Sequence, residues 1–438
     1  MALEEATKDL AQPQPVVAFQ IPSLIKRNTM LLALSQAFVG AGMQMVPALG
    51  AILAVQLAGS ASFAGVGVAL IGISRFVVSY PLGKLMDTHG RKLGLLLGLA
   101  LGIVGATLTG LSPVWHSLAL FLIGMLVFGM GMGAAQQLRL AAADMYPPSR
   151  RAEGLGYVLS GTLLGAMGAP LIVSTGQALA PTLRMDPLAL PWLFVPGVIV
   201  PAIFMILLVR PDPKEIAAHL ERYYPGYRPA APVATARHGG SSVAAFLRRY
   251  PLLVAFITYL AVQGNMAMIM AMTSLALNIH GHGLAAISIS VAIHVMGMFG
   301  LSLPLGKLTD RFGRRNLMLV GVIVTAVGSV LVPTSPDYWI VTAGTFLVGV
   351  GWSCVNVAAT TVIADTTGAA ERGRAIGTND TFSNASAVVL PILGGPMVEW
   401  FGLQSIAVIG IAAMIAPFLL LLRLHEPRPG RYLEGKLA

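Results

Sequence analysis

Three ionisable side chains lie inside long apolar stretches of this sequence: Arg75, His294 and Asp380. In such surroundings a carboxylate or an imidazole can take up and release a proton, and a guanidinium can pair with a carboxylate. A charge at the centre of a bilayer costs roughly 2.5–3.5 kcal/mol on insertion scales, so each charged group needs a partner or a path to water. The chemistry that these residues offer is therefore proton transfer and ion pairing.

The stretches around these residues are long enough to cross a bilayer. Hydrophobic residues make up 56% of the 438 residues and charged residues 11%, against roughly 25% charged residues in soluble domains. Apolar runs of about 20 residues recur along nearly the whole chain, which predicts an all-α membrane protein with twelve spans. They lie near 29–57, 61–83, 93–112, 116–143, 153–178 and 190–209, and near 251–279, 284–306, 317–334, 338–364, 375–399 and 403–424.

A Pro-, Gly- and charge-rich segment, residues 210–250, separates the two sets of six spans. We expect an N-terminal tail at 1–28, a six-helix bundle at 29–209, this linker, a second six-helix bundle at 251–424 and a C-terminal tail at 425–438. The N-terminal tail lacks an apolar core, so no cleaved signal peptide is expected. Basic residues gather in alternate connections, with Arg184 the exception, which places both termini and the linker in the cytoplasm. The net charge of +10 therefore reports topology and implies no nucleic-acid partner.

The two sets of spans carry the same motif between apolar stretches. Residues 83–92 read GKLMDTHGRK and residues 306–315 read GKLTDRFGRR, while Asp144 recurs at a similar offset as Asp365. Repeats of half a chain in an apolar sequence indicate a transporter built from two membrane halves. The motif residues that matter are Gly83, Asp87, Gly90 and Arg91 in the first copy and Gly306, Asp310, Gly313 and Arg314 in the second.

Each motif residue has a physical role in a short connection. The first glycine lets helices approach closely and the second permits a tight turn. Asp144 and Asp365 are expected partners for Arg91 and Arg314, and a cluster that forms in one conformation and breaks in another is a conformational latch.

The duplicated motif resembles that of the major facilitator superfamily, and the resemblance covers essentially the whole chain. It implies a substrate site between the halves, lined by the first, fourth, seventh and tenth spans, and a monomeric carrier that works by alternating access. The first motif copy has Thr88 where the family usually has a basic residue, which predicts a weaker first latch. Drug exporters of the family carry an arginine where this chain has Val127, so the resemblance to exporters is weak.

Neutral polar groups lie on the four spans expected to line the site. They are Gln36, Gln44, Gln136, Gln137, Gln263, Asn265, Trp352 and Asn356. Amides offer donors and acceptors without charge, which favours a neutral or amphipathic substrate over a polyanion; the alternative is that individual amides tie helices together. We expect Arg139 to belong to the surface cluster around Asp144.

Arg75 and Asp380 differ from the residues at the equivalent positions of the other repeat, which are the apolar residues Met298 and Leu159. These two charges therefore do not belong to the scaffold that the repeats share. In the family the second and eleventh spans meet between the halves. We therefore hypothesise an Arg75–Asp380 pair that closes the cytoplasmic side in the outward-facing state; alternatively, each charge pairs within its own half or reaches water. His294 is a second candidate for proton coupling, or a buried, hydrogen-bonded neutral histidine.

Other chemistry receives little support. His280 and His282 lie near a Met-rich segment and could bind a soft metal, but the intervening glycines favour an ordinary turn, so no metal and no cofactor are expected. The sequence has no paired-carboxylate site, nucleophile triad, phosphate-binding loop or CxxC, so it is not that of an enzyme.

The sequence thus predicts a secondary active transporter of the inner membrane, with a small organic solute and protons as its partners within the lipid bilayer. Export of the solute in exchange for protons is the first hypothesis. The alternatives are proton-linked uptake of a nutrient or metabolite, or a non-transporting sensor or scaffold with a transporter fold.

Overall fold

The computed structural model describes residues 20–147, 150–225, 227 and 243–425. The expected C-terminal tail after residue 425, most of the N-terminal tail and most of the linker lie outside the described residues. Within these described ranges, eleven helical segments are long and apolar enough to cross a membrane. The segments Leu284–Phe299 and Pro304–Phe312, which meet at 43°, form a twelfth when they are taken as one span. The prediction of an all-α membrane fold with twelve spans is confirmed.

The first six spans are formed by helices of the N-terminal half. These are α2 (Ser23–Met43), η1 (Val46–Gly50), α3 (Ala51–Ala58), η2 (Ala61–Phe63), α4 (Val66–His89), α5 (Arg91–Leu111), α6 (Leu118–Ala135), α7 (Leu138–Asp144), α8 (Arg151–Leu183) and α9 (Ala189–Leu208). The first span begins earlier than predicted, at Ser23, because Arg27 and Asn28 continue the helix and bind the carbonyl oxygen of Arg210, each at 3.1 Å.

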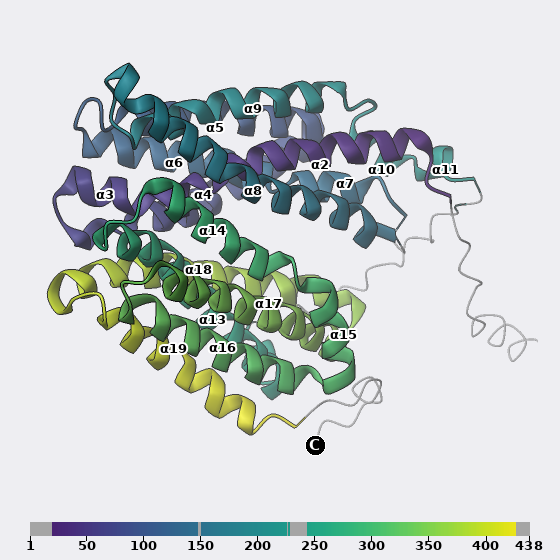
Figure 1. The fold of residues 1–438 in the computed structure, drawn as a ribbon. Coiled ribbons are helices and arrows are strands. Elements are labelled where there is room, and N and C mark those ends of the chain that lie inside the picture. The colour runs from purple at the N-terminus through teal and green to yellow at the C-terminus, as the bar shows by residue number, and fades with distance from the viewer. Residues whose placement is uncertain (1–19, 148–149, 226, 228–242, 426–438) are drawn as a thin grey trace, which may run out of the picture.

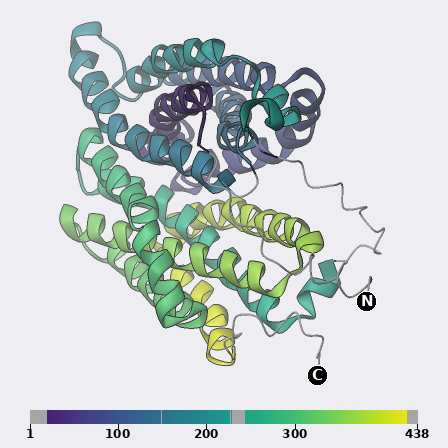
Figure 2. The same ribbon diagram turned by 90° about the vertical axis from the view of Figure 1, so that its right-hand side faces the viewer.

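The last six spans follow the linker, whose described residues form three short helices. The linker holds α10 (Pro213–Ala218), α11 (Leu220–Tyr223) and α12 (Val243–Leu247). The C-terminal half consists of α13 (Tyr250–Ile279), α14 (Leu284–Phe299), α15 (Ser302–Phe312), α16 (Arg314–Thr334), α17 (Tyr338–Thr366), α18 (Ala369–Phe401) and α19 (Ser405–Leu422). Figure 1 shows the two halves one above the other with their helices running across the view, and Figure 2 shows them end-on as two separate bundles.

Glycines allow close packing inside each half. A Cβ at Gly105 would lie 2.2 Å from the backbone nitrogen of Phe128, so α5 and α6 are nearly in backbone contact. The corresponding helices of the second half repeat the arrangement, since a Cβ at Gly328 would lie 2.4 Å from the carbonyl oxygen of Gly344. Small residues at helix crossings are typical of membrane bundles, where van der Waals packing replaces the hydrophobic drive between helices.

The molecule has two distinct ends. We call the end that carries Arg91 and Arg314, where α5 and α16 begin, the basic end. We call the opposite end, which carries Ala61 at the start of η2 and Glu399 near the end of α18, the far end. In Figure 1 the basic end lies at the right, beside α10, α11 and α15.

The two halves touch along the pair α4 and α18 only at the far end. A Cβ at Gly65 would overlap the carbonyl of Pro391, and one at Gly72 would lie 2.4 Å from Val388. Gly83 lies on the same face of α4, because it follows Gly72 by about three helical turns, yet a Cβ there would meet nothing within 4 Å. The helices therefore meet at the far end and separate toward the basic end.

A hydrogen bond at an interruption of the first span also joins the halves. Pro47 has no N–H and sits in the π-helical turn η1, which interrupts the first span between α2 and α3. The hydroxyl of Ser274 on α13 donates to the carbonyl oxygen of Pro47. The break in the first span thus supplies an acceptor for a helix of the other half.

Two side chains of the far end bind the first turns of helices in the opposite half. Glu399 accepts hydrogen bonds from the backbone nitrogen of Ala61 at 2.6 Å and from the hydroxyl of Ser60 at 3.2 Å. Gln177 on α8 accepts one from the backbone nitrogen of Ala285 on α14 at 3.2 Å. Among the described residues, every hydrogen bond between the halves lies at the far end or in η1, so the structure is closed at the far end.

Candidate functional site

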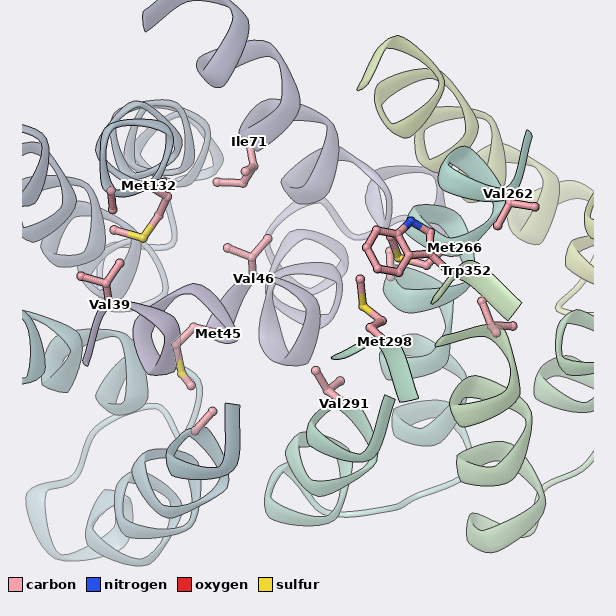
Figure 3. Packing of buried hydrophobic residues seen from close by; sticks show 14 of the residues in the cluster. Val39, Met45, Val46, Ile71, Met132, Val262, Met266, Val291, Met298 and Trp352 are labelled. Atoms are coloured by element: carbon pink, nitrogen blue, oxygen red, sulfur yellow. The ribbon is translucent and has the colours of Figure 1, made fainter. Parts of the chain in front are cut away.

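An aromatic cluster forms the part of the site that belongs to the C-terminal half. The indole nitrogen of Trp352 on α17 donates to Gln263 Oε1 on α13 at 2.6 Å. The ring of Trp352 lies 5.8 Å from that of Phe299 in an edge-on arrangement and 6.5 Å from that of Tyr259. Figure 3 shows Met266 and Met298 beside the same indole. This surface is apolar with one amide at its edge.

The N-terminal half supplies two arginines. Arg139 on α7 is exposed and donates to Gln136 Oε1 at 3.1 Å, across the short break between α6 and α7. The charge of Arg139 acts on Arg75 of its own half and on Asp380 and Tyr259 of the other. Arg139 on α7 therefore lies within electrostatic range of Arg75 on α4 and of Asp380 on α18.

The expectation that Arg139 belongs to the Asp144 cluster is wrong. Asp144 Oδ2 instead accepts from Arg91 Nε at 2.9 Å. Arg139 and Asp144 are five residues apart on one helix, which turns their side chains about 140° away from each other. Asp144 therefore faces α5, and Arg139 points away from it.

Among the described residues, no carboxylate pairs with Arg75 in this conformation. Its Nη2 atom lies 3.8 Å from Met43 Sδ, and its Nε atom is buried without a hydrogen-bond partner in the same part of the chain. The side chain lies against α6 at Gly133, where a Cβ would come within 3.2 Å of Arg75 Cγ. Glycine at position 133 thus makes room for the aliphatic part of the Arg75 side chain.

Asp380 is exposed on the part of α18 that has separated from α4. Among the described residues no ion pair joins it to Arg75. The hypothesised Arg75–Asp380 pair belongs to the opposite conformation, in which the basic end is closed, and it stays a prediction.

His294 lies inside the C-terminal half, between α14 and α17. It is fully buried, and its Nδ1 atom lies 2.6 Å from the carbonyl oxygen of Thr345. Gly349 lies beside the ring, since a Cβ there would come within 3.3 Å of Nδ1. The Nε2 atom has no hydrogen-bond partner among the described residues. This is the environment of a packed histidine, and a role in proton coupling stays a prediction.

Seven of the eight polar residues expected to line the site fall into three groups. Gln263 and Trp352 are paired, as described above. Gln36 and Gln44 on the first span are almost fully buried. The remaining amides, Gln136, Gln137 and Asn356, are partly exposed.

Asn265 does not line the site, which corrects the sequence-based expectation. It is fully buried, and its Nδ2 atom donates to Ser329 Oγ on α16 at 2.7 Å. Side chains two positions apart on a helix differ by about 200° in direction, so Asn265 points away from the side on which Gln263 lies. Asn265 ties helices together, the alternative that the sequence left open for such amides.

Both motif copies form the expected ion pairs at the basic end. Arg91 binds Asp144 at 2.9 Å and Asp87 at 3.3 Å. In the second copy Arg314 contacts Asp365 at 3.1 Å and Asp310 at 3.7 Å. A switching role for these clusters stays a prediction, as does the weaker first latch.

The motif glycines behave differently from one another. Gly90 and Gly313 have φ values of 99° and 92°, a left-handed conformation that favours glycine and forms the predicted tight turn. Gly83 and Gly306 were expected to permit close helix contact, but a Cβ at either would meet nothing within 4 Å. The halves are separated at the basic end in this conformation, so close helix contact at these two glycines stays a prediction.

Sequence reasoning missed the way in which the linker binds the first motif copy. Asp212 accepts from the backbone nitrogens of Arg91 and Lys92 at 3.1 and 3.0 Å, which caps α5. Lys214 Nζ binds the carbonyl oxygens of Asp87 and Thr88. The linker therefore brings a positive charge to the first copy, where Thr88 replaces the usual basic residue.

The histidine pair at the far end is part of a turn. Gly281 has a φ of 80°, and His282 Nε2 lies 2.9 Å from the carbonyl oxygen of Pro336. Within the described ranges no three His, Cys, Asp or Glu side chains are placed to hold a metal ion.

Comparison with known proteins agrees with this architecture. The sequence model described as Major Facilitator Superfamily matches residues 32–300 and again residues 252–437. An uncharacterised MFS-type transporter of Bacillus subtilis, YdeG, is 26% identical over 391 residues, covering 89% of each chain. The riboflavin transporter RfnT of Brucella anthropi is 24% identical over 403 residues, covering 91% of this chain and 96% of the relative.

A solved structure has the same fold. The inward open structure of the xylose transporter XylE from E. coli aligns with a TM-score of 0.65 at 15% sequence identity. The alignment covers 94% of this chain and 98% of that one.

Proposed function

Because this chain belongs to the major facilitator superfamily and is a membrane transporter rather than an enzyme, we propose that it carries a small organic solute by alternating access, with Asp380 as the residue that binds the coupling proton. The observation that carries the proposal is the position of Asp380. It is an exposed carboxylate within a helix that is long and apolar enough to cross a membrane, on the separated part of that helix, whose other end is packed against the opposite half.

The closed far end and the separated basic end correspond to one of the two states of such a carrier. The positive-inside pattern of the sequence supports a cytoplasmic basic end. With that orientation the structure corresponds to the inward-facing state of an inner-membrane protein. In that state a solute or a proton reaches Asp380 and Arg139 from the cytoplasm. The opposite state forms when the far-end contacts break and the basic ends of α4 and α18 meet.

The charges of the site favour the movement of proton and solute together. Arg75 and Arg139 carry two positive charges, which the ionised Asp380 offsets only once. When Asp380 is protonated, it no longer neutralises an arginine, and both arginines can interact with an electron-rich solute. Binding of the proton therefore strengthens binding of the solute, and binding of the solute strengthens binding of the proton. Exchange of a solute for a proton instead requires that the solute and the proton compete for the site. Of the two directions left open by the sequence, the arrangement therefore supports proton-linked uptake over export by exchange.

Alternating access can be tested by distance measurements between spin labels. One pair, Thr88→Cys with Arg374→Cys, reports on the basic end, and a second, Val114→Cys with Gln404→Cys, on the far end, both in a Cys354→Ala background. We expect the basic-end distance to shorten and the far-end distance to lengthen in the same fraction of molecules as the pH falls through the range in which carboxylates take up protons. The Asp380→Asn protein should lose this pH dependence. Two fixed distances at every pH would contradict the proposal and favour a non-transporting scaffold.

A further inference from the structure

We propose that the start of the linker acts as a clamp on the first motif copy, in which Lys214 takes the place of the basic side chain that position 88 lacks. The clamp positions the end of α4 for closure of the basic end. This inference rests on the proposed alternating access and adds two positioning residues, Asp212 and Lys214. It is carried by the hydrogen bonds that their side chains make to the backbone on both sides of the motif turn.

Both side chains of the clamp bind backbone groups that helix ends leave without partners. Asp212 accepts from the first two backbone nitrogens of α5 at 3.1 and 3.0 Å. Lys214 Nζ donates to the carbonyl oxygens of Asp87 and Thr88 in the last turn of α4. An anion at the start of a helix and a cation at its end also complement the helix dipole. One short segment therefore caps the end of the second span and the start of the third.

The clamp is fixed to the N-terminal half on both sides. Before it, the carbonyl oxygen of Arg210 accepts from two side chains of α2, each at 3.1 Å. After it, the side chains of Ile216, Leu220 and Tyr224 are buried, and the Tyr224 hydroxyl donates to the carbonyl oxygen of Met145 at 3.0 Å. This part of the linker therefore belongs structurally to the N-terminal half.

The second motif copy has its basic side chain on the helix itself. Arg311 occupies the position equivalent to Thr88 and lies in the last turn of α15. In the part of the chain that the structure describes, no side chain caps the start of α16. Each copy thus has one basic side chain at the end of its first helix, Arg311 from α15 and Lys214 from the linker. The weaker first latch expected from Thr88 should therefore appear only when Lys214 is removed.

The clamp acts on the part of α4 that must approach α18 when the basic end closes. The helix is packed inside its own half as far as Met86, which is fully buried and lies 2.3 Å from the position of a Cβ at Gly94. The next three side chains, those of Asp87, Thr88 and His89, are exposed. Because this last turn has few packing contacts, the clamp sets its position in advance, and a preorganised surface binds at a lower entropic cost.

A rescue experiment with two readouts tests the clamp. Hydrogen exchange of residues 84–95 reports on the motif turn, and spin labels at Lys84→Cys and Arg374→Cys, in a Cys354→Ala background, report on closure of the basic end at low pH. In Lys214→Gln we expect exchange to rise and the closed population to fall, each roughly fivefold, the factor that loss of one helix cap gives.

The matched variants separate the basic charge from its position in the chain. Thr88→Arg added to Lys214→Gln should restore most of both effects, because it supplies the basic side chain from α4 itself, as Arg311 does for α15. Lys214→Arg should behave as the wild type. Lys26→Gln removes an exposed lysine of the same end and should change neither readout.

Failure of the clamp can be told apart from failure of alternating access. If the wild type closes at low pH and Lys214→Gln closes equally well, the inference is overturned and alternating access stands. If Lys214→Gln impairs closure and Thr88→Arg restores nothing, Lys214 does not replace the basic side chain of the first copy, which also overturns the inference. If the basic end of the wild type never closes, alternating access is contradicted and the positioning role falls with it.

Discussion

The carboxylate of Glu399 lies 2.6 Å from the backbone nitrogen of Ala61, so a residue of the C-terminal half caps the first turn of a span in the N-terminal half. Gln177 and Ala285 repeat this relationship in the opposite sense. In each case a side chain late in the fifth span of one half binds the start of the second span of the other. The far end is thus held by two crossed caps, one charged and one neutral.

Removal of the charged cap should favour opening of the far end. Glu399→Ala leaves the Ala61 nitrogen without its acceptor, and loss of a helix cap costs about 1 kcal/mol. The population with an open far end should therefore rise roughly fivefold, as measured with the far-end spin-label pair. Asp186→Asn is the matched control, because Asp186 binds Gln56 within the same half. Equal populations in Glu399→Ala and in Asp186→Asn would contradict a latching role for Glu399.

Bulky residues at the exposed interface glycines should block closure of the basic end. Gly83 and Gly377 lie on the faces of α4 and α18 that meet at the far end, and a Cβ at either meets open space. Gly83→Leu and Gly377→Leu should therefore fold normally but oppose the closed state by about 1–3 kcal/mol through overpacking. Transport should fall roughly five- to hundredfold. Gly197→Leu on α9, which also has open space, should transport normally, and normal transport in all three proteins would show that these faces never meet.

Arg75 and Asp380 should depend on each other for transport. Arg75→Ala and Asp380→Ala should each impair solute transport, because the pair proposed for the closed basic end is lost. The double charge swap, Arg75→Asp with Asp380→Arg, should restore part of the activity, as a double-mutant cycle measures. Full activity in both single alanine proteins would remove the basis for the pair.

The carboxylates of the two motif clusters should contribute unequally to stability. Asp144 and Asp365 have about a quarter of their side chains exposed, whereas Asp87 and Asp310 are 72% and 76% exposed. Asp144→Asn and Asp365→Asn should each lower the free energy of unfolding by about 1 kcal/mol, since solvent screens such pairs only in part. Asp87→Asn and Asp310→Asn should have little effect in thermal unfolding. The reverse order would show that the exposed contacts dominate.

The repeat and the hydropathy of the sequence are sufficient to predict the twelve spans and the ion pairs of Arg91 and Arg314, because these depend on local order along the chain. The direction in which a side chain points from its helix is harder to predict from the sequence. Asn265 and Arg139 were placed wrongly, since each step of one residue along a helix turns the side chain by about 100°. The caps made by Glu399 and Gln177 depend on how the halves dock, which no pattern within one half records.

The most direct test of the account is proton flux in proteoliposomes on addition of each member of a panel of small organic compounds under an imposed pH gradient. We predict that wild-type protein moves protons in the same direction as the solute and that Asp380→Asn, shown to be folded, moves none. Equal flux in both proteins would contradict the role of Asp380, and protons moving against the solute would contradict the proposed direction of coupling.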